Sequence, residues 1–274
     1  MKIMNNLEKK MVDVLIDLKE NHHVIGVKAE FEAEGTRLEE SLRLKEVVTK
    51  AGLDLTIKIG GCEAIRDMYE ARVIGVNTIV APMVESPYAL IKYLKSIKTS
   101  FPEEERSSVK FLINIETISG YHAFSDMIKI NEINELTGIV LGRVDMTGSM
   151  GLTREDVNSD KLFDMTHHLF TMAKEHHMEC VLGGGVSAET LPFIRKLPSG
   201  FVDRYETRKV IFGCPGALDE HAENGILKAV GFELMWLKNK RDFYKGIYEE
   251  DRARIDMLQS RYDTLIEQAG GLYE

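Results

Sequence analysis

Short apolar segments alternate with helical patterns along most of this chain, and this alternation limits the fold more than any other feature. The apolar segments predict seven strands, at residues 24–32, 53–59, 77–84, 109–116, 137–145, 179–183 and 202–212. Between them, apolar side chains recur at the spacing of a helix. Strands and helices that alternate in this way form a parallel sheet covered by helices.

Several of the predicted strands have one apolar face and one face that becomes polar towards the end of the strand. Residues two apart on a strand share a face, so Lys58 lies opposite Leu55 and Ile57. The polar side chains that this rule places together are Lys28, Glu30, Glu32, Lys58, Asn114, Glu116, Arg143 and Asp145. The pattern predicts an α/β fold, a TIM (β/α)8-like barrel whose polar inner face opens into a site at the C-terminal ends of the strands.

Seven predicted strands are one fewer than a complete barrel needs. We therefore expect either a strand hidden near the N-terminus or a barrel that is irregular at its first strand. The barrel is expected to occupy residues 1–217. Residues 218–274 carry apolar positions at helical spacing and predict a long C-terminal helical extension. This helix packs either on its own barrel or on a neighbouring subunit. In the second case the protein would be a homo-oligomer.

Composition excludes several classes of protein. The 274 residues carry a net charge of -9, which argues against binding to nucleic acid because phosphates demand a basic surface. No stretch approaches the roughly 18 to 20 apolar residues that a membrane span requires. Cys62, Cys180 and Cys214 are widely separated and include no C-x-x-C pair, so we expect neither disulfides nor a thiolate zinc site and place the protein in the cytoplasm.

Two carboxylates follow apolar runs where the predicted strands end. Glu116 comes after the run 109–113, and Asp145 comes after the run 137–141. A charge at the end of a buried strand needs a partner, and a divalent cation is the commonest functional one. Carboxylate oxygens with open coordination positions suit Mg²⁺ or Mn²⁺.

Three segments together carry a family resemblance. They are Gly75–Ser86 (GVNTIVAPMVES), Phe111–Thr117 (FLINIET) and Gly138–Thr147 (GIVLGRVDMT). In order and spacing they resemble the HpcH/HpaI aldolase and citrate lyase family of the phosphoenolpyruvate/pyruvate barrel superfamily, over residues 24 to 215. The resemblance implies a metal-dependent carbon–carbon lyase or aldolase that acts on a 2-oxo acid or an acyl-derived enolate.

The resemblance also implies roles for individual residues. Glu116 and Asp145 match the metal ligands of the family, so the cofactor would be Mg²⁺ or Mn²⁺. The backbone N–H groups of Val144 and Asp145, preceded by Arg143, would receive the carboxylate of the substrate. Asn114 takes a place where Gln is common and could orient a metal-bound water. Lys58 takes the place of a usual Arg and offers a point charge instead of a planar fork.

The first strand departs from the family pattern. Aldolases of this family often place an Asp and a Glu-His pair there, whereas this chain has Lys28-Ala29-Glu30-Phe31-Glu32. Proton transfer would fall to Glu30, Glu32, a metal-bound water or the substrate itself. Citrate lyase-like members also manage without that His, which keeps a lyase function open.

Two functions other than that of a lyase are compatible with the same sequence. A phosphoenolpyruvate-using transferase or mutase would employ the same metal, with Arg204, Arg208 or the loop Gly183–Gly185 binding phosphate. Arg208 could equally bind an anionic substrate of the lyase or form a structural ion pair. A third possibility is a non-catalytic barrel that uses its long helix for assembly.

Overall fold

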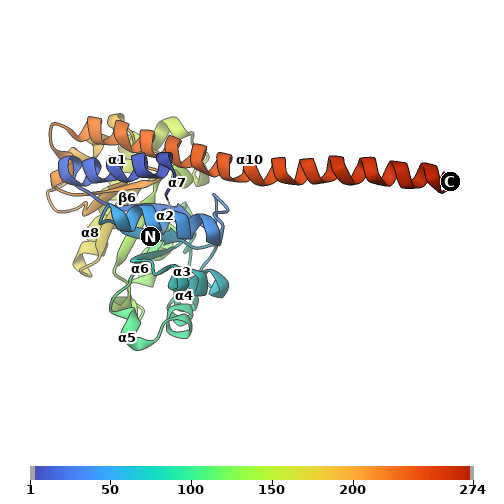
Figure 1. Ribbon diagram of the computed structural model, residues 1–274. Coiled ribbons are helices and arrows are strands. Elements are labelled where there is room, and N and C mark those ends of the chain that lie inside the picture. The colour runs from blue at the N-terminus through green and yellow to red at the C-terminus, as the bar shows by residue number, and fades with distance from the viewer. Residues whose placement is uncertain (1–3, 272–274) are drawn as a thin grey trace. The chain divides into compact units, whose positions relative to one another are not determined.

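The computed structural model describes residues 4–271 and contains a closed barrel of eight strands with helices on its outside (Figure 1). Each strand is hydrogen-bonded to its neighbours in the order of the sequence, and β8 closes the barrel onto β1. The strands are β1 (Val24–Glu30), β2 (Asp54–Lys58), β3 (Thr78–Ala81), β4 (Lys110–Ile115), β5 (Gly138–Gly142), β6 (Glu179–Gly183), β7 (Arg204–Glu206) and β8 (Val210–Gly213). The predicted TIM-like barrel is confirmed.

Helices connect most of the strands. The α-helices are α1 (Asn6–His22), α2 (Leu38–Lys50), α3 (Ile65–Ile74), α4 (Pro87–Ser100), α5 (Glu103–Arg106), α6 (Ile118–Met127), α7 (Arg143–Ser149), α8 (Asp160–Glu175), α9 (Leu191–Lys196) and α10 (Ala222–Gln268). The 3₁₀ helices are η1 (Ile133–Glu135), η2 (Arg154–Asn158), η3 (Ala188–Thr190) and η4 (Gly216–Leu218). Local sequence fixes several helix starts: Ser86 accepts a hydrogen bond from Ala89 N at the start of α4, and Pro87 suits its first turn.

The barrel is irregular where it closes. The predicted strand 202–212 is two short strands, β7 and β8, joined by a turn at residues 207–209. Strand β8 is antiparallel to both β7 and β1, and its register with β1 shifts between Val24 and Gly26. The eighth strand that the sequence left unassigned is therefore β8, inside the predicted strand 202–212 and not near the N-terminus, because the sequence pattern does not show that the chain reverses there.

The predicted strands 24–32 and 137–145 end two and three residues earlier than expected. Strand β5 ends at Gly142, so Arg143 and Asp145 belong to the first turn of α7 and not to a strand. Strand β1 ends at Glu30, which leaves Glu32 in the following turn. The apolar pattern did not predict where these two strands end. A carboxylate that follows an apolar run can lie at the end of a strand or in the next turn or helix, since carboxylates are also common in the first turn of a helix.

The inside of the barrel has an apolar floor below a polar mouth. Val80, Leu112, Val140 and Val181, from β3 to β6, form one buried cluster. Strand register pairs Val80 with Lys58, so the floor shares a barrel face with polar residues at the strand ends. Side chains of the other strand face, such as Ile57 and Ile113, are completely buried.

Helix α10 spans two compact units of the chain. The first unit extends to Glu233 and contains the barrel, whereas the second begins at Leu234 and consists of the rest of α10 and the residues after it. This division lies within the helix, beyond the expected boundary at 217. In the part of the chain that is described, no helix combines the length and apolar composition needed to cross a lipid bilayer.

Candidate active site

A cavity of about 460 Å³ lies at the C-terminal ends of the parallel strands. Ten charged side chains contribute to its lining. They comprise six carboxylates (Glu30, Glu32, Glu116, Asp145, Glu206 and Glu233) and four cations (Lys28, Lys58, Arg154 and Arg208). Most residues predicted from sequence as site residues therefore meet in one cavity that carries an excess of two negative charges.

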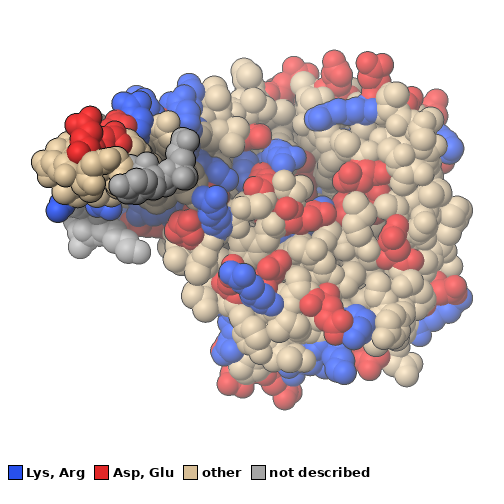
Figure 2. Space-filling model, turned by 90° about the vertical axis from the view of Figure 1, so that its right-hand side faces the viewer, with Lys and Arg blue, Asp and Glu red and all other residues tan. Residues whose placement is uncertain are grey.

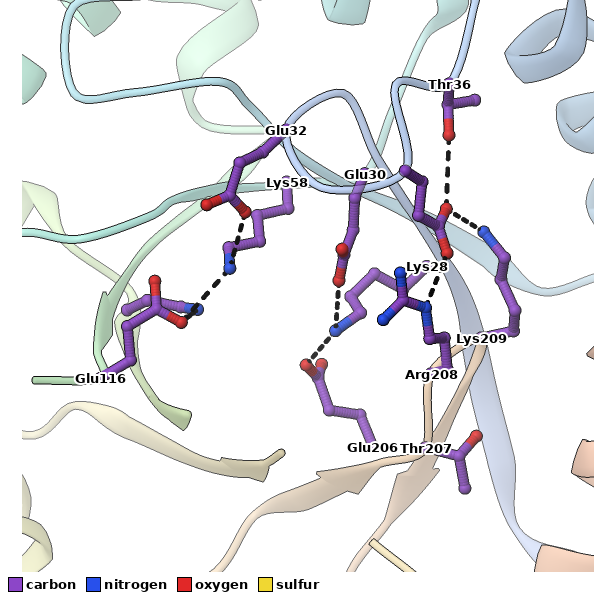
Figure 3. A network of polar contacts seen from close by, with 12 residues as sticks. Lys28, Glu30, Glu32, Thr36, Lys58, Glu116, Glu206, Thr207, Arg208 and Lys209 are labelled. Atoms are coloured by element: carbon purple, nitrogen blue, oxygen red, sulfur yellow. Dashed lines mark hydrogen bonds and ion pairs between the residues drawn. The ribbon is translucent and has the colours of Figure 1, made fainter. Parts of the chain in front are cut away.

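Lys58 joins two carboxylates inside this cavity (Figure 3). Its Nζ lies 2.9 Å from Oε2 of Glu32 and 3.2 Å from Oε2 of Glu116. Burial alone would lower the pKa of the ammonium group, but Glu116 and Glu32 outweigh this effect and the pKa of Lys58 is raised. Lys58 therefore stays protonated and holds a positive charge between the two carboxylates.

Glu116 is the most completely held carboxylate of the cavity. It is 2% exposed, and Oε2 accepts a hydrogen bond of 2.7 Å from Nδ2 of Asn114. Its other oxygen, Oε1, accepts one of 2.9 Å from the backbone N–H of Met83. On the remaining side is Gly142, where an added Cβ would lie 2.7 Å from Oε2 of Glu116. Only glycine at 142 leaves the carboxylate in this position.

A second buried network joins β1 to β7. Nζ of Lys28 lies 2.5 Å from Oε1 of Glu206 and 3.2 Å from Oε1 of Glu30 (Figure 3). Burial opposes the charge of Lys28, but the two carboxylates raise its pKa. Burial raises the pKa of Glu30, yet Lys28 and Lys58 outweigh it and hold the pKa below its usual value. Lys28 and Glu30 are therefore ionised at neutral pH, and Glu30 is a weak base.

Asp145 faces the cavity from the first turn of α7 and is exposed. Its pKa is raised, first by partial desolvation and then by the charges of Glu116, Glu32 and Glu30, although Lys58 opposes them. Asp145 thus lies in a field of excess negative charge, which a bound cation would relieve.

The start of α7 adjoins the glycine loop that follows β6. Gly184 has φ +75°, and an added Cβ would lie 2.4 Å from the backbone N of Arg143 and 2.7 Å from that of Val144. A side chain at 184 would therefore occupy the space beside the backbone predicted to receive a carboxylate. Val144 and the loop Gly183–Gly185 both line the cavity.

The structure does not bring the side chain of Arg143 into the cavity. Arg143 is completely buried, and burial lowers the pKa of its guanidinium to about 9. Nε donates to the carbonyl oxygen of Gly183 at 3.1 Å, and one terminal nitrogen donates to the carbonyl of Val157 at 3.1 Å and to Asn158 Oδ1 at 2.7 Å. The side chain holds the glycine loop in place. The prediction that Arg143 faces substrate depended on residue 143 being part of a strand, whereas it is the first residue of α7.

The two arginines at the end of the barrel have different surroundings. Arg208 lines the cavity and its Nε donates to Oε1 of Glu34 at 3.2 Å, so it forms the expected ion pair while it faces the cavity. Arg204 does not line the cavity and pairs with Glu179 at the start of β6. Arg204 is therefore unavailable as a phosphate ligand at the mouth.

A divalent metal fits the donors of this cavity. Glu116 and Asp145 both line it, and the lining carries two more negative than positive charges. Oδ1 of Asn114 is buried without a hydrogen-bond partner, which leaves an acceptor for a metal-bound water or a ligand. Within residues 4–271, no cluster of three His, Cys, Asp or Glu side chains could enclose a metal by itself. Mg²⁺ often binds through only one or two carboxylates, with water and substrate completing its ligands.

Arg154 and Glu233 line the cavity but were not predicted from the sequence. Lys28 was placed on the polar face of its strand, but its contact with Glu206 could not be predicted because it depends on barrel closure. Arg154 lies on η2 and Glu233 lies on α10. Neither position carries a local signal, because the fold alone brings these elements to the mouth.

Comparison with known proteins agrees with the fold. The solved structure of the citrate synthase SbnG is similar over 85% of this chain and 90% of its own, with a TM-score of 0.57 and 14% sequence identity. An HpcH/HpaI aldolase from Desulfitobacterium hafniense DCB-2 matches over 72% and 80%, with a TM-score of 0.55 and 11% identity. An HpcH/HpaI aldolase/citrate lyase family protein from Burkholderia cenocepacia J2315 matches over 70% and 89%, with a TM-score of 0.56 and 10% identity.

Sequence comparison gives the family. No curated protein matches the sequence significantly. The model of the HpcH/HpaI aldolase/citrate lyase family matches residues 45–188, more than half of the chain. The matched segment contains Lys58, Asn114, Glu116 and Asp145, and excludes Lys28 and Glu206. The chain belongs to the HpcH/HpaI aldolase/citrate lyase family.

Proposed function

We propose that this protein is a metal-dependent carbon–carbon lyase or aldolase that acts on a 2-oxo acid or an acyl-derived enolate. The observation that carries the proposal is the convergence of Glu116, Asp145 and Lys58 in one cavity. All three lie within the segment that matches the family. Carbon–carbon cleavage next to a carbonyl leaves an enolate, and the cavity offers positive charge where that oxygen would bind.

Glu116 and Asp145 are the residues that would hold Mg²⁺ or Mn²⁺. When bound, such an ion polarises a carbonyl oxygen and stabilises an enolate. Asn114 and the backbone N–H of Met83 fix the orientation of Glu116. Because Lys58 already contacts Glu116, its ammonium group lies beside the same ligand and can stabilise negative charge that develops on the substrate.

The carboxylate of the substrate would bind beside the backbone N–H groups of Val144 and Asp145. Gly184 leaves this space open, since any side chain there would fill it. The cavity of about 460 Å³ suits a small metabolite. Arg208 and Arg154, also in its lining, supply positive charge for a second carboxylate.

Glu32 is the residue we assign to proton transfer. No histidine is among the residues found to line the cavity, and its carboxylates are the side chains available for this role. Glu30 is held by Lys28 and its pKa is lowered, which makes it a poor base. Glu32 contacts Lys58 and lies in the turn after β1, where its side chain is 26% exposed and can reach substrate and water.

The test measures enolisation together with metal binding. With Mg²⁺ or Mn²⁺ present, we expect the methyl protons of pyruvate to exchange in heavy water, and oxaloacetate or a 4-hydroxy-2-oxo acid to release pyruvate. Glu116→Gln should abolish both the exchange and the binding of Mn²⁺ measured by calorimetry. Glu63→Gln is the matched control, because Glu63 is a carboxylate outside the cavity that pairs with Lys92.

Three results would contradict the proposal. Unchanged Mn²⁺ affinity in Glu116→Gln would remove the metal assignment. Release of inorganic phosphate from phosphoenolpyruvate, without cleavage of any 2-oxo acid, would identify a phosphoenolpyruvate-using transferase or mutase instead. Metal binding without exchange of pyruvate protons or cleavage of an oxo acid would indicate a non-catalytic barrel.

A further inference from the structure

From Leu234 onward, α10 carries a line of side chains spaced alternately three and four residues apart. The line contains Leu234, Leu237, Arg241, Tyr244, Tyr248, Asp251, Ile255, Leu258, Tyr262 and Leu265. Eight of these ten side chains are apolar or aromatic, which is typical of the a and d positions of a coiled coil. We call this line the seam of α10.

The spacing of the seam indicates a helical partner. A straight helix drifts by about 20° per heptad relative to a strict seven-residue repeat, so a seam kept over four heptads requires supercoiling around another helix. Seven of the seam residues are between 49% and 63% exposed, including Leu234, Ile255 and Leu258. A single helix cannot bury its own apolar stripe, so these side chains need a partner.

Charge is sorted around the seam. The e and g positions beside it carry six cations, Lys238, Lys240, Lys245, Arg252, Arg254 and Arg261, and no anion. The positions on the far side carry six anions, Asp242, Glu249, Glu250, Asp256, Asp263 and Glu267, and no cation. The charges follow the same seven-residue repeat as the apolar side chains of the seam. This agreement independently supports the assignment of the heptad positions.

The two charged seam residues identify the partner. Arg241 occupies an a position and Asp251 a d position, and they lie five residues on either side of Gly246. In an antiparallel pair of helices, a residues pack against d residues of the other helix. If two copies of α10 cross at Gly246, Arg241 of each meets Asp251 of the other. The same register pairs Leu234 with Leu258.

The remaining seam residues match in this register as well. Leu237 meets Ile255 and Tyr244 meets Tyr248, so each apolar side chain between residues 234 and 258 finds an apolar partner. We propose that α10 pairs with α10 of a second copy of this chain, in an antiparallel coiled coil centred on Gly246. This partner places an apolar side chain or an opposite charge against every seam residue of that segment. Within the single chain Arg241 pairs with Asp242 at 2.7 Å, so Asp251 is the seam charge for which an unrelated helix or a membrane surface provides no assigned counter-charge.

One feature opposes the pairing and makes it testable. In the same register, Lys238 faces Arg252 and Lys245 faces its own copy, so like charges meet along the edges. Exposed like charges cost little and are screened by salt, whereas a seam charge buried without a partner costs far more. The self-pair should therefore tighten as salt is added. An acidic partner helix would instead be released by salt.

The experiment is a charge exchange in the full-length protein, with association measured by analytical ultracentrifugation. We expect R241D, and separately D251R, to weaken self-association by at least about 100-fold, since each buries like charges in the seam. The double variant R241D/D251R should restore it to within about 10-fold of the natural sequence. Neither residue lines the cavity, so activity per barrel provides a check that the barrel is intact.

A distance measurement tests the direction of the two helices. A spin label at S260C in each copy should give an axial separation of about 42 Å in the antiparallel pair, because 28 residues separate the two levels at 1.5 Å each. Parallel helices would bring the labels to within about 20 Å. Cys180 is buried, and the pKa values of all three native thiols are raised, so the added exposed thiol reacts first.

Three outcomes would overturn the proposal. The first is a natural protein that remains monomeric at high salt. The second is a double variant that associates no better than the single ones. The third is a label separation that fits parallel helices or that appears only when anionic lipid vesicles are added. Recovery in the double variant together with the long separation would establish the antiparallel self-pair.

Discussion

Nζ of Lys58 lies 3.2 Å from Oε2 of Glu116, the carboxylate that we assign to the metal. The side chain of Lys58 is 9% exposed and that of Glu116 is 1% exposed, so water screens this pair poorly. In the absence of metal, the ammonium group balances the charge of Glu116. With metal bound, Lys58 and the ion would share this carboxylate, and the positive charge available to a substrate oxygen would increase.

Replacing Lys58 by methionine tests this sharing. Lys58→Met leaves Glu116 buried without its cation, so the metal-free protein should lose on the order of 3 kcal/mol of unfolding free energy. Mn²⁺ should restore more stability to the variant than to the natural protein, because it replaces the missing charge. Turnover should fall by at least about 100-fold even with metal. Chemical denaturation with and without Mn²⁺ measures the first two effects.

Lys58→Arg is the matched control, because it keeps the charge and changes its shape. It should retain most of the stability of the natural protein and more activity than Lys58→Met. If Lys58→Met were as stable as the natural protein without metal, the ion pair would contribute nothing to the site.

Asp145 gives the site a dependence on pH. Its folded-state pKa is raised, so the charged form is disfavoured in the folded protein. This cost is present above the raised pKa and disappears as pH falls below the ordinary value of 3.8. Asp145→Asn should therefore stabilise the metal-free protein at neutral pH, and the gain should shrink towards pH about 4. Thermal melting across this range measures the effect.

The same variant should lose metal affinity. Asp145→Asn removes one charged ligand, so we expect the dissociation constant for Mn²⁺ to rise by at least about 10-fold. In the natural protein, affinity should decrease as Asp145 becomes protonated, beginning at a higher pH than for a free aspartate. Equal affinity of the two proteins at pH 7 would exclude Asp145 as a ligand.

Arg143 should act on stability more than on chemistry. Arg143→Met leaves the carbonyl oxygens of Gly183 and Val157 without their donor, which should cost about 2–4 kcal/mol. Because the guanidinium does not line the cavity, the affinity for Mn²⁺ should change less than about threefold. Urea unfolding and calorimetry separate the two quantities. A large loss of metal affinity in a variant of unchanged stability would place Arg143 in the site after all.

Much of the fold could be predicted from local pattern. Alternating faces placed Lys58, Asn114 and Glu116 on one side of their strands, and those side chains do meet in one cavity. The reversal at residues 207–209 could not be predicted, since it depends on a turn of three residues between two short strands. The alternation of apolar and polar residues indicates which face of a strand a side chain lies on. It does not indicate whether the strand runs parallel or antiparallel to its neighbours.

The contacts within the site were less predictable than its members. The pairing of Lys28 with Glu206 joins residues 178 positions apart and exists only because the barrel closes. Arg143 was misplaced because the predicted strand continued three residues beyond Gly142, where α7 begins and the alternation of strand faces no longer applies. Which residues line the cavity follows from the alternation of side chains along each strand. Which partner each side chain contacts depends on how the barrel closes and on where the strands end.

Two glycines allow the metal side and the carboxylate side of the cavity to be disturbed separately. Gly142→Ala places a Cβ 2.7 Å from Oε2 of Glu116, so that carboxylate must move, and Mn²⁺ affinity should fall by at least about 10-fold. Gly184→Ala places a Cβ 2.4 Å from the backbone N of Arg143, beside the proposed site for the substrate carboxylate. It should raise KM for pyruvate-like substrates by at least about 10-fold and leave Mn²⁺ affinity nearly unchanged.

Both variants should be measured at one temperature, together with Gly148→Ala as a control. An added Cβ at Gly148 meets no atom within 4 Å, so this variant should behave like the natural protein in metal affinity and KM. Gly184 also has φ +75°, and the strain of an alanine there should lower the melting temperature. Comparison at saturating Mn²⁺, below the melting range of all three variants, separates that loss from the change in KM. If Gly184→Ala bound substrate normally, the substrate carboxylate would have to bind elsewhere in the cavity. The candidates would then be Arg208 and Arg154, because the other two cations of the lining, Lys28 and Lys58, are held in the buried networks.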